Sequence, residues 1–291
     1  MRFSRIPFLA VLVSAALLAD ASHAADLKLP RPSQKAQVMQ TVGLTDVTIN
    51  YSRPGVKGRT IWGELVPYDK VWRTGANEAT DITFSTDVKV NGQALAAGTY
   101  SLHTIPTKSD WTVIFNKKAD QWGSYSYDQK EDALRIQVKT QPHEMTEWME
   151  FSLPNIAVDN ATVALDWEKL RIAFDIQVET VEHALASARA AMASLAADDY
   201  NTAFRCAAFA FQNNVAPDEA RQWIDKSISI KETWLNLRTK ADMLAKDGKT
   251  AEAIQFGEKA IAVGKAAGDT PAEEIAKIEK QVAEWKKAKK S

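Results

Sequence analysis

The spacing of apolar residues changes once along this chain, and the change falls at Glu179. Before it, apolar and polar residues alternate in short runs such as 134–138, which is the spacing of half-buried β-strands. After it, apolar residues recur about every 3.6 positions in alanine-rich segments, which indicates amphipathic helices. The sequence therefore predicts a β domain at 25–178 followed by an α-helical domain at 179–291, and a chain of 291 residues is long enough for both.

The N-terminus has the features of a secretory signal peptide. Arg2 and Arg5 precede an apolar run at 8–19, which is shorter than a membrane-spanning helix requires. Small residues at the end of this segment predict cleavage after Ala24, so that residues 1–24 are removed. We therefore expect an exported, periplasmic protein, and no apolar run of the mature chain is long enough to span a membrane.

The β part contains short apolar runs separated by turn residues. Asn91-Gly92 is the clearest hairpin turn, because both residues accept a positive φ. We count about nine or ten strands and no helix before residue 178, a pattern typical of a two-sheet antiparallel β-sandwich. The expected strands lie at 37–42, 47–51, 82–85, 88–90, 98–102, 111–115, 134–138, 148–151, 161–165 and 170–174.

The longest interruption between strands is the loop at 50–81. Loops of this length inside a compact domain are uncommon and often carry function. Its cations could line a site for a small anion, because arginine offers a planar fork to carboxylate, phosphate or sulfate. The alternative is structural: Arg73–Glu78 and Arg59–Glu64 ion pairs would fasten the loop to the sandwich. Both interpretations are open at the level of the sequence.

Aromatic residues in this loop and near Gly123 add a carbohydrate interpretation, since sugar faces stack on exposed rings. Packing in the core or at a sheet edge is the commoner role of aromatic residues in β domains. The candidate binding residues are Arg53, Lys57, Arg59, Trp62, Trp72, Arg73, Asn77, Glu78, Trp122 and Tyr125.

Motifs for catalysis or cofactor binding are not found. The three histidines of the mature chain, His103, His143 and His183, lack the spacing of a metal site, so neither a metal nor a cofactor is predicted. A glycosidase-type carboxylate pair depends on geometry and leaves no motif, and Glu64 with Glu78 is the first pair to compare. We favour a non-enzyme and leave catalysis open.

Three motifs of the β part carry a family resemblance. They are R-P-x-x-K-G-R at 53–59, V-W-R-x-G-A-N-E-A-T at 71–80 and Q-W-G-x-Y-S-Y-D at 121–128. With the strands around them, these motifs make residues 35–178 similar to a family of exported bacterial proteins known as domain of unknown function 2911. The resemblance implies an exported β-sandwich, often followed by helical repeats, and brings no established activity with it.

The α-helical part resembles two degenerate tetratricopeptide repeats with a half-repeat before them and a capping helix after them. Helices are expected at 179–197, 200–213, 217–230, 232–247, 250–266 and 271–288. Small residues that let paired helices approach recur at the repeat spacing: Ala241, Gly248, Ala253 and Ala260, then Ala208, Ala220 and Ser227, then Ala186 and Ala193. Such repeats commonly contact other proteins, but packing beside the sandwich would also explain them.

The formal net charge of −1 gives no case for nucleic-acid binding. The function we expect is that of a non-catalytic binding or scaffolding module of the cell envelope. It would bind a small anion or a glycan at the 50–81 loop and another envelope protein through the helical repeats. The alternatives are a hydrolase that acts on envelope glycans through loop carboxylates, and a purely structural envelope component.

Overall fold

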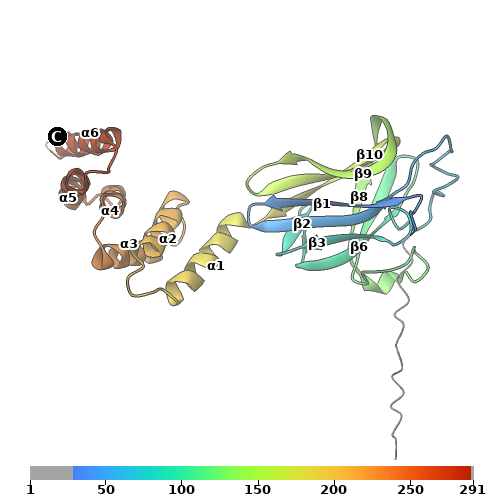
Figure 1. Ribbon diagram of the computed structural model, residues 1–291, viewed down its shortest axis with the longest axis horizontal. Coiled ribbons are helices and arrows are strands. Elements are labelled where there is room, and N and C mark those ends of the chain that lie inside the picture. Colours follow the sequence, from blue (N-terminus) through green and yellow to red (C-terminus); the bar gives the residue numbers. More distant parts are fainter. Residues whose placement is uncertain (1–28, 290–291) are drawn as a thin grey trace, which may run out of the picture.

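The computed structural model describes residues 29–289, which form a β domain and an array of helices (Figure 1). The predicted signal peptide lies outside these residues. The strands are β1 Gln34–Val42, β2 Thr45–Arg53, β3 Thr80–Phe84, β4 Val88–Val90, β5 Gln93–Leu95, β6 Gly98–Ile105, β7 Asp110–Asn116, β8 Asp132–Lys139, β9 Gln141–Ile156 and β10 Asn160–Val178.

The strands form two antiparallel sheets. The larger sheet has the order β1-β2-β3-β6-β7-β8, and the smaller sheet has the order β5-β4-β10-β9. The predicted sandwich is therefore confirmed. The hairpin turn predicted between β4 and β5 also forms, with Asn91 at φ 46° and Gly92 at φ 79°.

The prediction of separate strands at 161–165 and 170–174 was wrong, because both lie in the single strand β10, which has 19 residues. The strand register with β9 shifts on either side of Glu168, where φ is 56°. A bulge of this kind interrupts the alternation of side chains without ending the strand. The sequence pattern breaks at the bulge, and this break resembles a turn.

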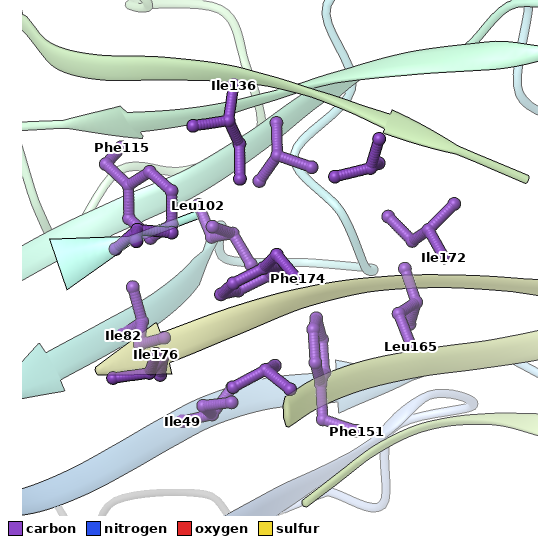
Figure 2. Close-up of a cluster of buried hydrophobic side chains, with 14 of the residues drawn as sticks. Ile49, Ile82, Leu102, Phe115, Ile136, Phe151, Leu165, Ile172, Phe174 and Ile176 are labelled. Carbon is purple, nitrogen blue, oxygen red and sulfur yellow. The ribbon is translucent and has the colours of Figure 1, made fainter. Parts of the chain in front are cut away.

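Alternating side chains from the two sheets meet in one hydrophobic core (Figure 2). Ile49 of β2 and Ile82 of β3 are fully buried, as is Ile176 of β10 from the opposite sheet. Phe115 and Phe174 join the sheets through an edge-to-face contact with ring centroids 5.6 Å apart. Aromatic pairs in this geometry add about 0.5–1.5 kcal/mol to the burial of their area.

Residues 54–79, here called the end loop, close the end of this core. Val56, Ile61 and Val66 of the end loop are all at most 4% exposed, so the loop buries side chains as a strand would. The backbone N–H groups of Trp72 and Thr104 donate to each other's carbonyls at 2.8 and 2.9 Å, which extends the pairing of β6. The end loop lies at the end of the sandwich opposite the helices (Figure 1).

Four tryptophans hold the end loop in place. Trp62 and Trp72 of the loop pack against Trp111 of β7 and Trp167 of β10, with ring centroids 4.9 to 6.2 Å apart. This tryptophan cluster gives the loop a packing role, so Trp62 and Trp72 do not present open faces to a sugar.

Six helices follow the sandwich: α1 Thr180–Ala193, α2 Tyr200–Gln212, α3 Pro217–Ile230, α4 Trp234–Lys246, α5 Thr250–Ala267 and α6 Ala272–Ala288. Each packs against the next, and the array extends away from the sandwich (Figure 1). Among residues 29–289, no helix has the length and apolar character needed to cross a membrane.

Only some of the small residues of the predicted repeats lie in contacts between helices. Ala220, Ala241, Ala253 and Ala260 are at most 2% exposed, as close helix packing requires. The half-repeat was placed in the wrong phase, since Ala186 and Ala193 of α1 are exposed. In a helix this rich in alanine the small residues occur on every face, so they do not specify which face is buried. The repeat assignment itself stays a prediction.

The first helix begins directly on the turns of the sandwich. Thr180 donates from Oγ1 to the Val158 carbonyl at 2.9 Å, and Lys89 and Glu179 form an ion pair at 2.6 Å. Gly43, in the turn between β1 and β2, has φ 58°. A Cβ at Gly43 would lie 2.0 Å from Thr180 Oγ1 and 2.8 Å from the Val158 carbonyl oxygen.

Gly43→Ala is therefore expected to destabilise the sandwich more than Gly92→Ala, by about 1–3 kcal/mol. Both glycines have a positive φ, but a Cβ at Gly92 would meet nothing within 4 Å. The difference between the two variants measures the steric conflict with α1, because the backbone strain is common to both. Urea denaturation of both variants tests this, and equal losses would show that the start of α1 moves aside freely.

Candidate functional site

Two adjoining cavities beside the end loop bring several predicted binding residues together. One, of about 300 Å³, is lined by Arg59, Trp72, Arg73 and Asn77 among others. The other, of about 340 Å³, is lined by Trp72, Arg73 and Tyr125 among others. Leu65, Trp72 and Arg73 line both, so we call the pair the Arg73 cavities.

Local hydrogen bonds fix the backbone around Arg73. The Trp72 indole N–H donates to the Gly75 carbonyl at 3.1 Å, and Thr80 donates from Oγ1 to the Thr74 carbonyl at 2.7 Å. Thr74 has φ 53°, a left-handed conformation that turns the chain sharply after Arg73. The buried indole and the turn together leave the Arg73 side chain between the two cavities.

The Arg73 guanidinium forms no side-chain hydrogen bond or ion pair within the described part of the chain, although it interacts electrostatically with Tyr125. Its Nε atom is buried without a hydrogen bond, and burial lowers the pKa of the group from its ordinary value. The predicted Arg73–Glu78 ion pair was wrong. Glu78 instead accepts two hydrogen bonds from Arg31 at 2.7 and 2.8 Å and lies 3.4 Å from the Lys35 ammonium.

The charges around the Arg73 cavities all have one sign. Arg59, Lys70 and Arg73 contribute positive side chains, and no aspartate or glutamate is among the described residues that line either cavity. Asn77 and Ser124 add polar groups to the walls. A concave surface with charges of a single sign concentrates ions of the opposite sign, so this site favours an anion.

Arg59 is less available than Arg73. Its guanidinium donates to the Val56 carbonyl at 3.1 Å and to the Gly55 carbonyl at 2.5 Å, so the predicted Arg59–Glu64 pair was also wrong. These two carbonyls orient Arg59 but do not neutralise it. The loop is thus fastened by apolar packing and backbone hydrogen bonds, and the expected ion pairs do not contribute.

Arg53, the last residue of β2, and Lys57 of the end loop lie elsewhere and contact β9. Arg53 donates to the Met149 carbonyl at 2.8 Å and forms an ion pair with Glu150 at 2.9 Å. The Lys57 ammonium lies over the Trp148 ring, 5.5 Å from its centroid. Both cations therefore have structural partners and are not among the residues that line the Arg73 cavities.

Glu78 lines a separate cavity of about 530 Å³ together with Asp81 and Asp120. Burial, aided by the negative charge of Asp120, raises the pKa of Asp81 to about 6. Burial also acts to raise the pKa of Glu78, but the hydrogen bond from Arg31 and the charge of Lys35 outweigh it and the pKa is lowered. Glu64 does not line this cavity. Glu64 and Glu78, the first pair to compare for a glycosidase-type site, therefore do not share this pocket.

Trp122 and Tyr125 are the two predicted aromatic residues with open rings, being 58% and 89% exposed. Their segment is held beside the end loop, since the Ala79 N–H donates to the Gln121 carbonyl at 2.8 Å and the Gly123 N–H donates to the Asn77 carbonyl at 3.2 Å. Arg31 lies over the Trp122 ring at 6.0 Å. The motifs at 71–80 and 121–128 therefore form one surface.

His103 and Ser124 were not predicted as part of this region. His103 is fully buried on β6, Ser124 Oγ lies 3.5 Å from its Nδ1, and burial lowers the pKa of His103 to about 4. Its Nε2 makes no hydrogen bond with a described residue. Strand alternation places His103 on the outer face of its sheet, but only the structure shows that the 121–128 segment covers it.

The described residues offer little for metal binding or for cysteine chemistry. No group of three or more His, Cys, Asp or Glu side chains within residues 29–289 is arranged to hold a metal ion. Cys206 is 8% exposed, and burial raises the pKa of its thiol, as expected for an inert cysteine in a helix contact.

Comparison with curated proteins and with solved structures gives no match for this chain. One family model, described as "Protein of unknown function (DUF2911)", matches residues 33–176, which span the sandwich from the start of β1 almost to the end of β10. All three motifs of the end loop and of the 121–128 segment fall inside this match. Through its β-sandwich, this chain therefore belongs to the DUF2911 family of proteins of unknown function.

Proposed function

We propose that the β-sandwich is a non-catalytic binding module for a small anion, which the Arg73 guanidinium holds in the Arg73 cavities. The observation that carries this proposal is the half-buried Arg73 side chain, which lacks an anionic partner and faces two cavities without carboxylates. Withdrawing a cation from water costs several kcal/mol, and a bound anion offsets this cost. Arginine binds oxyanions through two parallel hydrogen bonds, which adds orientation to attraction.

Arg73→Ala is expected to raise the Kd of a bound anion at least about 30-fold, since removing one partner of a desolvated charge pair costs about 2 kcal/mol or more. Calorimetric titration of residues 25–291 with acetate, sulfate and phosphate measures the change. Arg73→Lys keeps the charge without the planar fork and should lose part of the affinity. The thermal midpoint of Arg73→Ala should not fall, because this guanidinium has no ion pair to lose.

Lys108→Ala is the matched control, since it removes one positive charge from an exposed position of the same domain. It should leave both affinity and stability unchanged. A large stability loss in Arg73→Ala would assign the side chain to the fold, and binding that survives the substitution would contradict the proposal.

The location and the helical partner are further parts of the same proposal. The exported, periplasmic location is supported by the signal-like segment at 1–24. The contact with another envelope protein is supported by the helical array, which extends away from the sandwich (Figure 1). N-terminal sequencing of the exported protein should begin at Ala25. A partner that co-purifies with residues 25–291 should be absent when residues 179–291 are removed, and a partner retained without them would contradict the role of the helices.

A further inference from the structure

Tyr125 stands at the edge of the Arg73 cavities with most of its ring open to solvent. It is 89% exposed and lines the same 340 Å³ cavity as Arg73. Its hydroxyl forms no hydrogen bond with another described residue. A rigid ring in this position offers an apolar face next to a charged group, at little cost in side-chain entropy.

Gly123 leaves room for the edge of this ring. Gly123 has φ 66°, and a Cβ built on it would lie 2.9 Å from Cε2 and 3.0 Å from Cδ2 of Tyr125. One edge of the ring therefore rests on the glycine backbone, and only a residue without a side chain leaves room for it. The ring is supported from one side and remains open on the other.

Among the cations that line the site, one is withdrawn from water and lacks a hydrogen bond within the described residues. Arg73 is the cation that is both half-buried and uncommitted, because the Arg59 guanidinium already donates to two carbonyls and Lys70 is exposed to water. One planar guanidinium matches one carboxylate through two parallel hydrogen bonds. A phosphate dianion would leave part of its charge without a desolvated partner.

The volumes limit the size of the ligand. The two cavities measure about 340 and 300 Å³, at the lower end of the range of about 300–1,000 Å³ for small-molecule sites. Each cavity therefore suits a unit of the size of one sugar ring, and a longer chain would have to extend over Tyr125.

From these observations we infer that the ligand is a carboxylated sugar of the uronic-acid type. Its carboxylate is bound by Arg73, and the C–H face of its ring stacks on the open face of Tyr125. This inference rests on the proposed function and narrows it to one ligand class.

Three probes separate the contributions of charge and ring. D-Glucuronate and D-glucose share a sugar ring and differ in the carboxylate, whereas acetate carries the carboxylate without the ring. In calorimetric titrations of residues 25–291, the Kd of glucuronate should be about 2- to 12-fold lower than that of acetate, as one aromatic stacking contact allows. It should also be lower than that of glucose, which lacks the carboxylate that Arg73 binds.

Tyr125→Ala should raise the Kd of glucuronate to that of acetate and leave acetate binding unchanged, while Tyr125→Phe should keep the preference. Trp122→Ala is the matched control, because Trp122 is an exposed aromatic residue of the same segment that is not among the residues lining the Arg73 cavities. It should leave the Kd of glucuronate unchanged.

Equal Kd values for glucuronate and acetate, unaffected by Tyr125→Ala, would overturn the inference and leave the proposed anion site intact. A tripeptide with a free C-terminal carboxylate that binds more tightly than glucuronate, and depends on Tyr125, would overturn it in favour of peptide recognition. If acetate, sulfate, phosphate and glucuronate all fail to bind, the proposed function itself fails.

Discussion

Replacing Trp72 by alanine is expected to lower the free energy of unfolding of the sandwich by about 3–5 kcal/mol. Trp72 is 9% exposed, and its ring lies 5.8 Å from that of Trp167 and 6.2 Å from that of Trp111. The substitution removes this packing and leaves the Gly75 carbonyl without the indole N–H that it accepts at 3.1 Å. A buried acceptor left without its donor adds to the loss.

The cost is expected to be large because Trp72 joins three distant parts of the chain. Trp111 comes from the six-stranded sheet, Trp167 from the four-stranded sheet, and Trp72 from the end loop between β2 and β3. The tryptophan cluster thus connects both sheets at the end of the core. A cavity at this position cannot collapse easily, since the backbones on all sides belong to paired strands.

Scanning calorimetry of residues 25–291 tests this prediction. A loss of this size corresponds to a fall of about 6–20 °C in the midpoint of the sandwich transition. Trp122→Ala is the control, because Trp122 is 58% exposed and should change stability by no more than about 0.5 kcal/mol. If Trp72→Ala does not fold, Trp72→Phe keeps an aromatic ring and should give a smaller loss. In a domain of this size, each kcal/mol of lost stability lowers the thermal midpoint by about 2–4 °C. A midpoint within about 1 °C of that of the unsubstituted protein would therefore contradict the packing role of the end loop.

Local sequence patterns were sufficient to predict most elements of the fold, although the short strand β5 was not among the expected strands. The strands and helices follow from residue alternation and helical periodicity, and the hairpin at Asn91-Gly92 follows from two residues that tolerate a positive φ. The pattern failed at Glu168, where a bulge carries β10 through a break in the alternation. A bulge depends on the register with β9, and local sequence contains no measure of that register.

The candidate site could be predicted where its residues are close in sequence. Arg59, Trp72, Arg73 and Asn77 line one cavity because they share a single loop that folds onto the end of the sandwich. The contacts of Arg53 could not be predicted in this way, because its partners Met149 and Glu150 lie 96 and 97 positions later in the chain. Contacts at this distance depend on the strand order of the sheets, which single-sequence patterns do not supply.

The burial of polar groups was the least predictable property. Glu78 has an arginine five positions before it, yet its partners are Arg31 and Lys35, more than forty positions earlier in the chain. His103 and Asp81 lie on the outer face of the larger sheet, where alternation alone would leave them exposed to water. The 121–128 segment folds over this face and removes His103 from solvent, with consequences for the pH dependence of stability.

One buried group and one half-buried group are expected to give opposite pH dependences that nearly cancel. The pKa of His103 is about 4 in the folded protein, mainly through burial, against 6.5 for an unperturbed histidine. Between these values the unfolded chain binds more protons at this residue than the folded one. Stability from His103 is therefore lost as the pH falls from 6.5 to 4, by at most about 3 kcal/mol.

Asp81 acts in the other direction. Burial and the charge of Asp120 raise its pKa to about 6, against 3.8 for an unperturbed aspartate. Between pH 6 and pH 4 the folded protein binds the additional proton, so stability from Asp81 increases as the pH falls, by less than about 3 kcal/mol because solvent screens this half-buried carboxyl. The two contributions overlap in one pH window, and their sum in the unsubstituted protein should be below about 1 kcal/mol.

The difference in stability between each variant and the unsubstituted protein isolates the contribution of the substituted group. Asp81→Asn keeps the size of the side chain without the titration, and its stability relative to the unsubstituted protein should fall by up to about 3 kcal/mol between pH 6.5 and pH 4. His103→Gln should change by a similar amount in the opposite direction. Urea denaturation at several pH values measures both slopes, and the comparison with the unsubstituted protein cancels the titration of all other groups.

These slopes test whether water reaches the face of the larger sheet beside the 121–128 segment. If water reached His103 and Asp81, both pKa values would return toward those of exposed groups, and neither substitution would change the pH dependence of stability. Relative to the unsubstituted protein, a flat difference for Asp81→Asn together with a slope for His103→Gln would place the water at Asp81 alone. Because His103 contacts Ser124 and Asp81 lies beside Asp120, such a result would also show which end of the 121–128 segment opens in solution.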